Sequence, residues 1–429
     1  MPRILIRSAQ EPSALLSPLE STRAMGGNSG NLLYAHGVHR AISVPDATVR
    51  AGAFRAHLLK DPTEWIEKVN SRYDHFVVPM SNAFRIGFSK KLEKLASIIE
   101  RIEIPVTVVG IGAQTVIDAG EGDGPIAMGR TGQTQTSSGE DAERHAKVVR
   151  RFVEATLART ASIGVRGELT KAYLVSVGVD PDRVDVIGCP SVFTWGPDHR
   201  VRQPEGTLGT NARVSLNVDF RVEGVAAVVE RNAATYRRLL SPVQDSNSAR
   251  MIITGEDTFD LGDVDDALPI HTDHPLYRSR RLVYFPNPWG WIEHARSQDF
   301  FFGTRLHGNI AGILGGTPAH LLAHDSRTRE LAEYHGIPYT RIQDLDEPPT
   351  AAELYARTDY TRFNDLLPQR FATYVDFLHR NGLATVWDEG NEAGAAAFDA
   401  QIAAGRKVSF VRPAPTRVEQ TLRRLRGRV

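Results

Sequence analysis

The segment at residues 303–309 reads Gly-Thr-Arg-Leu-His-Gly-Asn and holds the densest group of chemically reactive side chains in the sequence. It follows one apolar run and precedes another, which predicts a strand, a turn and the start of a helix. Backbone N–H groups at a helix start attract anions, and the planar guanidinium of Arg305 matches a carboxylate or a phosphate. His307 can exchange a proton near neutral pH. The same spacing also suits a structural arginine–carboxylate pair and a histidine that caps the helix.

Short apolar runs alternate with amphipathic stretches along most of the chain, which is typical of parallel sheets covered by helices. The expected strands are residues 4–6, 75–79, 106–110, 163–165, 184–188, 214–218, 251–254, 282–285, 300–303 and 320–322. The expected helices include residues 32–41, 90–101, 140–160 and 168–177. Ligands of such sheets bind beyond the carboxyl ends of the strands. The 303–309 segment therefore stands where a binding site is expected.

The alternation is interrupted at residues 195–210, where glycines and prolines suit a linker. We predict the fold class α/β, with two Rossmann-like domains that face a cleft and a helical C-terminal extension. The predicted parts are an N-terminal α/β domain at 1–198, a C-terminal α/β domain with the Arg-Leu-His-Gly motif at 210–345, and a helical extension with a basic tail at 346–429. A glycine-rich stretch at 114–140 is predicted to be either a lid over the cleft or an idle insertion.

The overall composition excludes several classes of function. Basic and acidic residues each total 51, so the formal net charge is zero, which argues against a nucleic-acid partner. The single cysteine, Cys189, cannot form an internal disulfide, and it rules out a cysteine-based zinc or iron–sulfur site. We expect no metal and no cofactor. No export signal and no apolar span of ~20 residues is apparent, so a cytoplasmic location is expected.

The end of the chain departs from this balance. Residues 405–429 carry eight basic residues against one acidic residue, a net charge of +7. Residues 417–426 suit a short helix with Val418, Leu422 and Leu425 on one stripe. Such a helix fits peripheral contact with an anionic membrane on its inner face. Packing of the tail across the acidic body, or a tail that stays in solvent, fits the charge pattern as well.

From Thr304 to Pro338 the sequence resembles the carboxyl-terminal signature of the polysaccharide pyruvyl transferase family. The shared features are Arg-x-His-Gly at a helix start, an apolar helix, Gly-x-Pro, a short strand and an aspartate before a basic helix. Weaker resemblances lie at residues 27–31, 110–114 and 163–170. Two positions depart from the family pattern, because Asn31 and Gly167 stand where aspartate is usual.

The resemblance implies a fold similar to the two-domain GT-B glycosyltransferases and transfer of pyruvate from phosphoenolpyruvate to a sugar. His307 and Arg305 take the catalytic positions, with Arg305 on the anion and His307 either as the acid on the methylene carbon or as the group that protonates the departing phosphate. Arg166 is the candidate second guanidinium from the opposite domain. The other candidate substrate-binding residues are Asn28, Gly30, Asn31, Gly112, Gln114, Leu306, Gly308 and Asp325. The expected acceptor is a cell-surface glycan or its lipid-linked precursor. The alternatives are a nucleotide-sugar-dependent glycosyltransferase and a non-catalytic sugar-binding relative.

Overall fold

The first half of the chain builds one parallel sheet. The computed structural model describes residues 1–113, 139–257, 267–405 and 410–414. Its N-terminal sheet has the order β2 (Thr48–Ala53), β1 (Arg3–Ser8), β3 (His75–Pro79) and β4 (Val106–Val109). A parallel bridge from Ile111 to Val165 carries this sheet on to β5 (Ile163–Val165) and β6 (Val184–Val186). All of these strands therefore end at the same edge.

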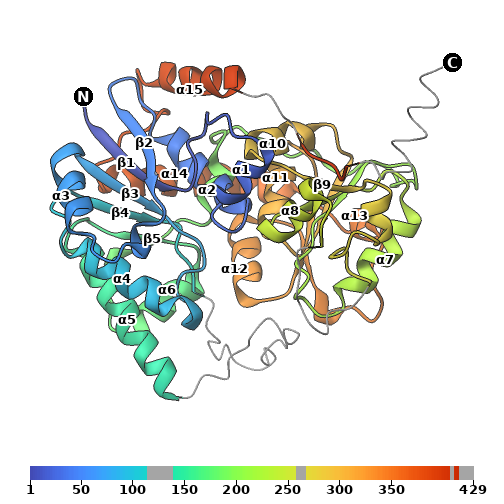
Figure 1. Cartoon of the computed structure of the whole chain (residues 1–429), viewed down its shortest axis with the longest axis horizontal. Helices are drawn as coiled ribbons and strands as arrows, with labels where there is room; N and C mark the ends of the chain where they lie inside the picture. The colour runs from blue at the N-terminus through green and yellow to red at the C-terminus, as the bar shows by residue number, and fades with distance from the viewer. Residues whose placement is uncertain (114–138, 258–266, 406–409, 415–429) are drawn as a thin grey trace.

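The second half repeats this plan. Its sheet has the order β12 (Tyr339–Arg341), β11 (Ala319–Ala323), β10 (Phe300–Gly303) and β7 (Val214–Leu216). A parallel bridge from Ser215 to Leu240 leads on to β8 (Ser241–Val243) and β9 (Leu282–Tyr284). The two halves lie side by side in Figure 1, with helices packed around each sheet. The predicted α/β fold with two Rossmann-like halves is confirmed.

Helices connect most of the strands, and their bounds follow the apolar periodicity of the sequence. In the first half they are α1 (Pro18–Arg23), α2 (Gly30–Ala41), α3 (Thr63–Arg72), α4 (Ser89–Ile99), α5 (Gly139–Leu157) and α6 (Glu168–Ser176). In the second half they are α7 (Val225–Thr235), α8 (Ser246–Thr254), α9 (Pro275–Arg278), α10 (Pro288–Arg296), α11 (Leu306–Leu314) and α12 (Ser326–His335). The four predicted helices agree with α2, α4, α5 and α6 to within a few residues.

One predicted strand is wrong. Residues 251–254 form the last turn of α8, although their β-branched and apolar side chains favour a strand. Capping at both ends explains the difference. The carboxylate of Asp245 accepts a hydrogen bond from the Ser248 N–H at 2.8 Å, and Gly255 ends the helix with a left-handed φ of 74°. The strand of this region is β8, which the sequence pattern did not reveal.

The C-terminal extension is helical over its described part. It consists of α13 (Ala351–Ala356), α14 (Thr361–Arg380) and α15 (Glu392–Gly405). At the end of α14, the Asn381 side chain accepts a hydrogen bond from the Ser162 N–H at 3.1 Å, so this helix ends on the N-terminal sheet. In α15, Asp399 pairs with Arg40 of α2 at 2.7 Å. The basic stretch predicted to form a helix at 417–426 lies outside the described residues.

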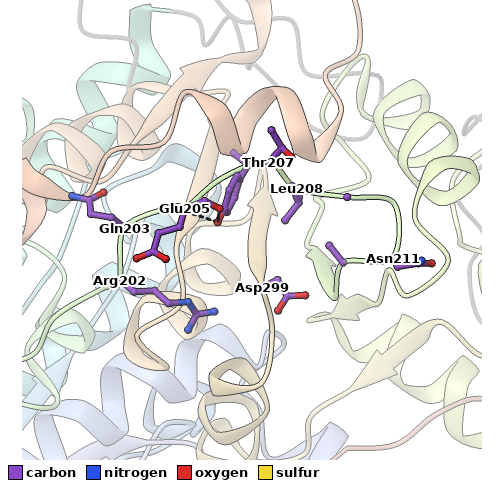
Figure 2. A pocket seen from close by; sticks show the side chains of 10 residues that line it. Arg202, Gln203, Glu205, Thr207, Leu208, Asn211 and Asp299 are labelled. Atoms are coloured by element: carbon purple, nitrogen blue, oxygen red, sulfur yellow. Dashed lines mark hydrogen bonds between the residues drawn. The ribbon is translucent and has the colours of Figure 1, made fainter.

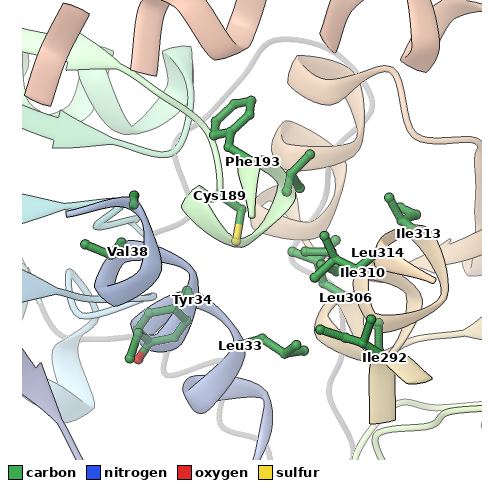
Figure 3. Packing of buried hydrophobic residues seen from close by; sticks show 14 of the residues in the cluster. Leu33, Tyr34, Val38, Cys189, Phe193, Ile292, Leu306, Ile310, Ile313 and Leu314 are labelled. Atoms are coloured by element: carbon green, nitrogen blue, oxygen red, sulfur yellow. The ribbon is translucent and has the colours of Figure 1, made fainter. Parts of the chain in front are cut away.

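A single apolar cluster joins the two halves. Figure 3 shows its centre, where Leu33 of α2 is directed toward α11 with its Ile310 and Leu314, Val38 lies on the other side of α2, and Cys189 lies between the two helices. All five side chains are almost fully buried. Burial of apolar surface stabilises the folded chain by roughly 25 cal/mol per Å². The cluster therefore fixes α2 against the start of α11, where the Arg-Leu-His-Gly motif lies.

Four buried histidines make the folded chain sensitive to acid. Burial lowers the pKa of His36 to about 4 and the pKa values of His39, His320 and His335 to about 3. Above the ordinary histidine pKa of about 6.5, the folded and unfolded chains are both neutral at these positions. As the pH falls from about 6.5 to about 4, the unfolded chain binds protons that the folded chain does not. The free energy of unfolding should therefore fall with pH in this window.

We expect each of these histidines to contribute about 1.4 kcal/mol per pH unit to that loss. Urea unfolding at several pH values measures the slope of the free energy of unfolding. The variant His320→Gln should be less stable but should reduce the slope by about one proton. His271→Gln, on a half-exposed turn, serves as the control for the loss of an imidazole outside the core. A free energy of unfolding that is flat between about pH 6.5 and pH 4 would contradict this expectation.

Candidate active site

His307 lies where the two halves meet. It occupies the first turn of α11, immediately after β10, and its side chain is half-buried. Its ring centroid is 5.6 Å from that of Tyr34 in α2, and its Nε2 atom is 3.9 Å from the Cys189 Sγ. Both neighbours come from the N-terminal half. A histidine of one domain therefore faces a helix and a turn of the other.

The glycines of the motif permit close packing around this histidine. A Cβ atom at Gly30 would lie 2.7 Å from the His307 Cβ, and a Cβ atom at Gly308 would lie 2.1 Å from the Asn217 Oδ1. Gly303 has a φ of +135°, which disfavours other residues. These positions therefore require glycine for packing, and Gly30 also brings α2 directly against the His307 side chain.

Arg166 approaches from the N-terminal half, as the resemblance implies. It follows β5 directly and is only 1% exposed. Its Nε donates a hydrogen bond to the Gly110 carbonyl oxygen at 2.8 Å, and its guanidinium carbon is 6.0 Å from the Tyr34 ring centroid. Its Nη2 has no hydrogen-bond partner among the described residues. A Cβ atom at Gly112 would lie 2.8 Å from the Arg166 Cδ, so this glycine makes room for the arginine.

Arg305 is held by the C-terminal half. Its Nε donates a hydrogen bond to the Val218 carbonyl oxygen at 2.9 Å, and its Nη2 is 3.7 Å from the Asp219 carboxylate. The same carboxylate binds Arg221 at 2.6 Å. Burial alone would raise the pKa of Asp219, but the charges of Arg305 and Arg221 outweigh burial and lower it well below its usual value. Asp219 therefore stays ionised and fixes two guanidinium groups at the carboxyl ends of the strands.

Asp325 pairs with Arg327, as Asp219 pairs with Arg305 and Arg221. Its carboxylate caps α12 by accepting a hydrogen bond from the Thr328 N–H at 2.7 Å, and it lies 3.1 Å from the Arg327 guanidinium. Burial raises the pKa of Asp325, but Arg327 and then His324 outweigh burial and bring it to about 2. Asp325 therefore pairs with an arginine and caps α12, and its contact with substrate stays a prediction.

The electrostatic environment of His307 is strongly positive. Burial lowers the pKa of His307 well below its usual value, and the charges of three arginines lower it further: Arg166, Arg327 and Arg305. The imidazole is therefore neutral near pH 7 in the free protein. A bound anion that offsets these charges would raise the pKa again.

The remaining predicted residues shape the site or lie apart from it. The Asn28 side chain accepts a hydrogen bond from the Gly30 N–H at 2.8 Å, and the Asn31 side chain donates one to the Gly26 carbonyl oxygen at 3.2 Å. Both amides therefore brace the turn before α2. Leu306 is only 6% exposed and packs in the apolar cluster between the halves, so its side chain is part of the core. Residues 114–138, which include Gln114 and most of the predicted lid, lie outside the described residues.

Sequence reasoning did not assign Tyr34, Asp219 and Arg327 to the site. Asp219 and Arg327 each follow a strand of the C-terminal sheet, at the edge where ligands bind. The sequence signal that could have identified Asp219 and Arg327 was thus a charged residue shortly after a buried strand. Tyr34 is different, because it lies inside a helical apolar pattern that gives no hint of a site.

The cavity shown in Figure 2 lies away from the arginines around His307. It has a volume of about 450 Å³ and is lined by Arg202, Asp299 and Tyr355, among others. Asp299 directly precedes β10, so this cavity is at the amino end of the C-terminal sheet, whereas ligands bind at the carboxyl end. The arginines around His307 therefore remain the candidate site. Within the described residues, no group of three or more His, Cys, Asp and Glu side chains could hold a metal ion.

Comparison with known proteins identifies a family. The model of the polysaccharide pyruvyl transferase family matches residues 29–326, and a search of curated proteins gives no match. Similar solved structures include the UDP-GlcNAc 2-epimerase of Methanocaldococcus jannaschii (10% identity, TM-score 0.40, 94% of this chain and 99% of that chain). A putative UDP-N-acetylglucosamine 2-epimerase of Listeria monocytogenes is 12% identical, with a TM-score of 0.39 and coverage of 89% and 98%. No helix in the described ranges is long and apolar enough to cross a membrane.

Proposed function

Because the chain belongs to the polysaccharide pyruvyl transferase family, we propose that it takes pyruvate from phosphoenolpyruvate and forms a pyruvate ketal on a sugar. The proposed acceptor is a cell-surface polysaccharide or its lipid-linked precursor. The observation that carries the proposal is the convergence of Arg166, Arg305 and Arg327 on His307. Phosphoenolpyruvate offers a carboxylate and a phosphate, the two groups that guanidinium forks bind best.

The proposed reaction needs an acid and two sugar hydroxyls. A proton adds to the methylene carbon of phosphoenolpyruvate, and positive charge develops at C2. A sugar hydroxyl attacks C2 and loses its proton, after which the C2–O bond to phosphate breaks. The departing phosphate takes up one proton, and a second hydroxyl closes the ketal while it loses its own. Two protons are consumed and two are released, so the reaction requires no redox partner.

His307 supplies the first of these protons in our proposal. In the free protein it is neutral, because burial and the nearby arginines disfavour the imidazolium. A donor with about three negative charges offsets the arginines and raises the pKa of His307. Binding of the donor therefore leads to protonation of His307, and His307 then protonates the methylene carbon of the donor. Binding of phosphoenolpyruvate and proton uptake by His307 are thus coupled. Without the donor, His307 is neutral and cannot act as an acid.

We accordingly expect phosphoenolpyruvate binding to take up a proton at about pH 7.5. Isothermal titration calorimetry in two buffers of different ionisation enthalpy measures the number of protons. His307→Gln should bind the donor with no uptake. The pH dependence of donor affinity follows from the lowered pKa of His307. Because the complex holds a proton that the free protein lacks, the affinity for the donor should increase as the pH falls towards 6.5. Equal proton numbers for the wild type and the variant would remove His307 from this role.

Donor choice tests the function as a whole. We expect phosphoenolpyruvate to raise the melting temperature of the protein, and UDP-sugars at the same concentration to have a much smaller effect. The reverse order would favour a nucleotide-sugar-dependent enzyme. Stabilisation by neither donor, together with binding of a glycan, would favour a non-catalytic sugar-binding protein.

A further inference from the structure

Three arginines of the N-terminal half lie at the carboxyl edge of its sheet. Arg7 is near the end of β1, Arg85 lies in the segment after β3, and Arg166 follows β5 directly. Because parallel strands end at one edge, these residues point to the same side of the sheet as the site. Only Arg166 was suggested by the sequence.

Three arginines at the carboxyl edge of the C-terminal sheet, Arg221, Arg305 and Arg327, each have a carboxylate partner. Asp219 lies 2.6 Å from Arg221 and 3.7 Å from Arg305, and Asp325 lies 3.1 Å from Arg327. These pairs cancel much of the positive charge on that side of the cleft. They also explain why the arginines remain fixed when no ligand is bound.

The N-terminal arginines differ in this respect. Within the described ranges, no carboxylate lies within 4.0 Å of Arg7, Arg85 or Arg166. The Arg7 side chain packs over the Phe54 ring at 4.7 Å, and the Arg85 side chain lies 5.5 Å from the Phe88 ring centroid. The buried Nε of Arg7, which is 5% exposed, has no hydrogen-bond partner there. Burying an unpaired charge costs stability, so the free protein retains these arginines at a cost.

Electrostatic coupling connects these residues to the site. Burial lowers the pKa of Arg85, and the charges of Arg327 and Arg221 lower it further, so Arg85 lies within electrostatic range of two arginines of the opposite half. Burial also lowers the pKa of Arg7. Burial raises the pKa of Tyr34, whose ring lies beside His307, and the positive charges of Arg7 and Arg166 act in the opposite direction. Arginines of both halves thus act on the adjacent rings of Tyr34 and His307.

We propose that Arg7 and Arg85, together with Arg166, form an N-terminal subsite that binds an anionic group of the donor. The subsite rests on the proposed function for the identity of its ligand. Three guanidinium groups without carboxylate partners match a donor that carries about three negative charges at neutral pH. The donor would supply the missing counter-charge.

The variant Arg85→Gln separates a binding role from a structural one. It should weaken phosphoenolpyruvate binding roughly 10- to 100-fold, which corresponds to the loss of a charge-assisted hydrogen bond. The melting temperature of the free protein should stay the same or rise, because an uncompensated positive charge is removed. Inorganic phosphate, used as a second probe, should stabilise the wild type more than the variant.

Two further variants complete the experiment. Arg7→Met fills a similar volume without the charge, and it should also bind the donor more weakly without a loss of melting temperature. Arg213→Gln is the control, because Arg213 pairs with Asp299 at 2.8 Å just before β7, at the opposite end of the strands. It should leave both ligand affinities unchanged.

The subsite is wrong if Arg85→Gln and Arg7→Met bind both probes as tightly as the wild type, or if they lose only melting temperature. This outcome is distinct from failure of the proposed function. Transfer from phosphoenolpyruvate with unchanged affinity in both variants would overturn the subsite and leave the function standing. Conversely, if phosphoenolpyruvate is not the donor, weaker phosphate binding by the variants would still support the subsite.

Discussion

Replacing His307 by glutamine should lower the rate of pyruvyl transfer by roughly 10²–10⁴-fold, the range for a lost general acid. Glutamine keeps a polar side chain beside Tyr34 but cannot exchange a proton near neutral pH. The melting temperature should change little, since the His307 side chain is half-buried and its only close polar contact is the Cys189 sulfur at 3.9 Å among the described residues. Steady-state release of phosphate, with donor and acceptor both saturating, measures the effect.

His199→Gln is a matched control for this variant. The His199 ring nitrogen Nε2 is 2.7 Å from the Ile313 carbonyl oxygen, near the other end of α11. A general disturbance of this helix would slow both variants, whereas loss of the acid slows only His307→Gln. Wild-type turnover in His307→Gln would exclude the imidazole from the reaction.

The variant Arg305→Lys should weaken donor binding by at least about tenfold, because lysine is a point charge that cannot form two parallel hydrogen bonds with a carboxylate or phosphate. We expect little change in melting temperature. Asp219 retains its closer partner Arg221 at 2.6 Å, so its buried charge stays paired. Calorimetric titration with phosphoenolpyruvate, together with thermal unfolding, measures both quantities.

Arg213→Lys provides the comparison for that substitution. Arg213 also pairs with an aspartate, at 2.8 Å, but at the amino end of the same sheet. It should show wild-type donor affinity. If Arg305→Lys loses melting temperature and keeps its affinity, Arg305 is a structural partner of Asp219 and no part of the donor site.

The sequence predicted the frame of the site because its signals are local. The apolar run at 300–303 and the glycines of the motif place β10, a turn and α11 correctly, and His307 and Arg305 lie at that turn. The alternation of strands and helices likewise predicted two parallel sheets. The failure at 251–254 was also local, since helix caps at Asp245 and Gly255 outweighed strand propensity.

The chemistry between the halves was harder to predict because it depends on contacts between distant residues. Tyr34 contacts His307 only after two sheets have packed through an apolar cluster. The pairing of Arg305 with Asp219 joins two different strand ends. Leu306 lies inside the motif, yet its apolar side chain is buried in the core. A motif thus predicts a backbone geometry more readily than it predicts the burial of each side chain.

Transfer of label from phosphoenolpyruvate to glycan tests the central claim most directly. Glycan isolated from a strain that lacks this gene serves as acceptor, which avoids the need to know the sugar beforehand. Purified protein and phosphoenolpyruvate labelled in its methyl-forming carbon are added, and the glycan is analysed by mass spectrometry. We predict a labelled, acid-labile pyruvate ketal and one phosphate released for each ketal formed, with His307→Gln nearly inactive. A glycan that gains no label, or that gains mass only from a UDP-sugar, would contradict the account.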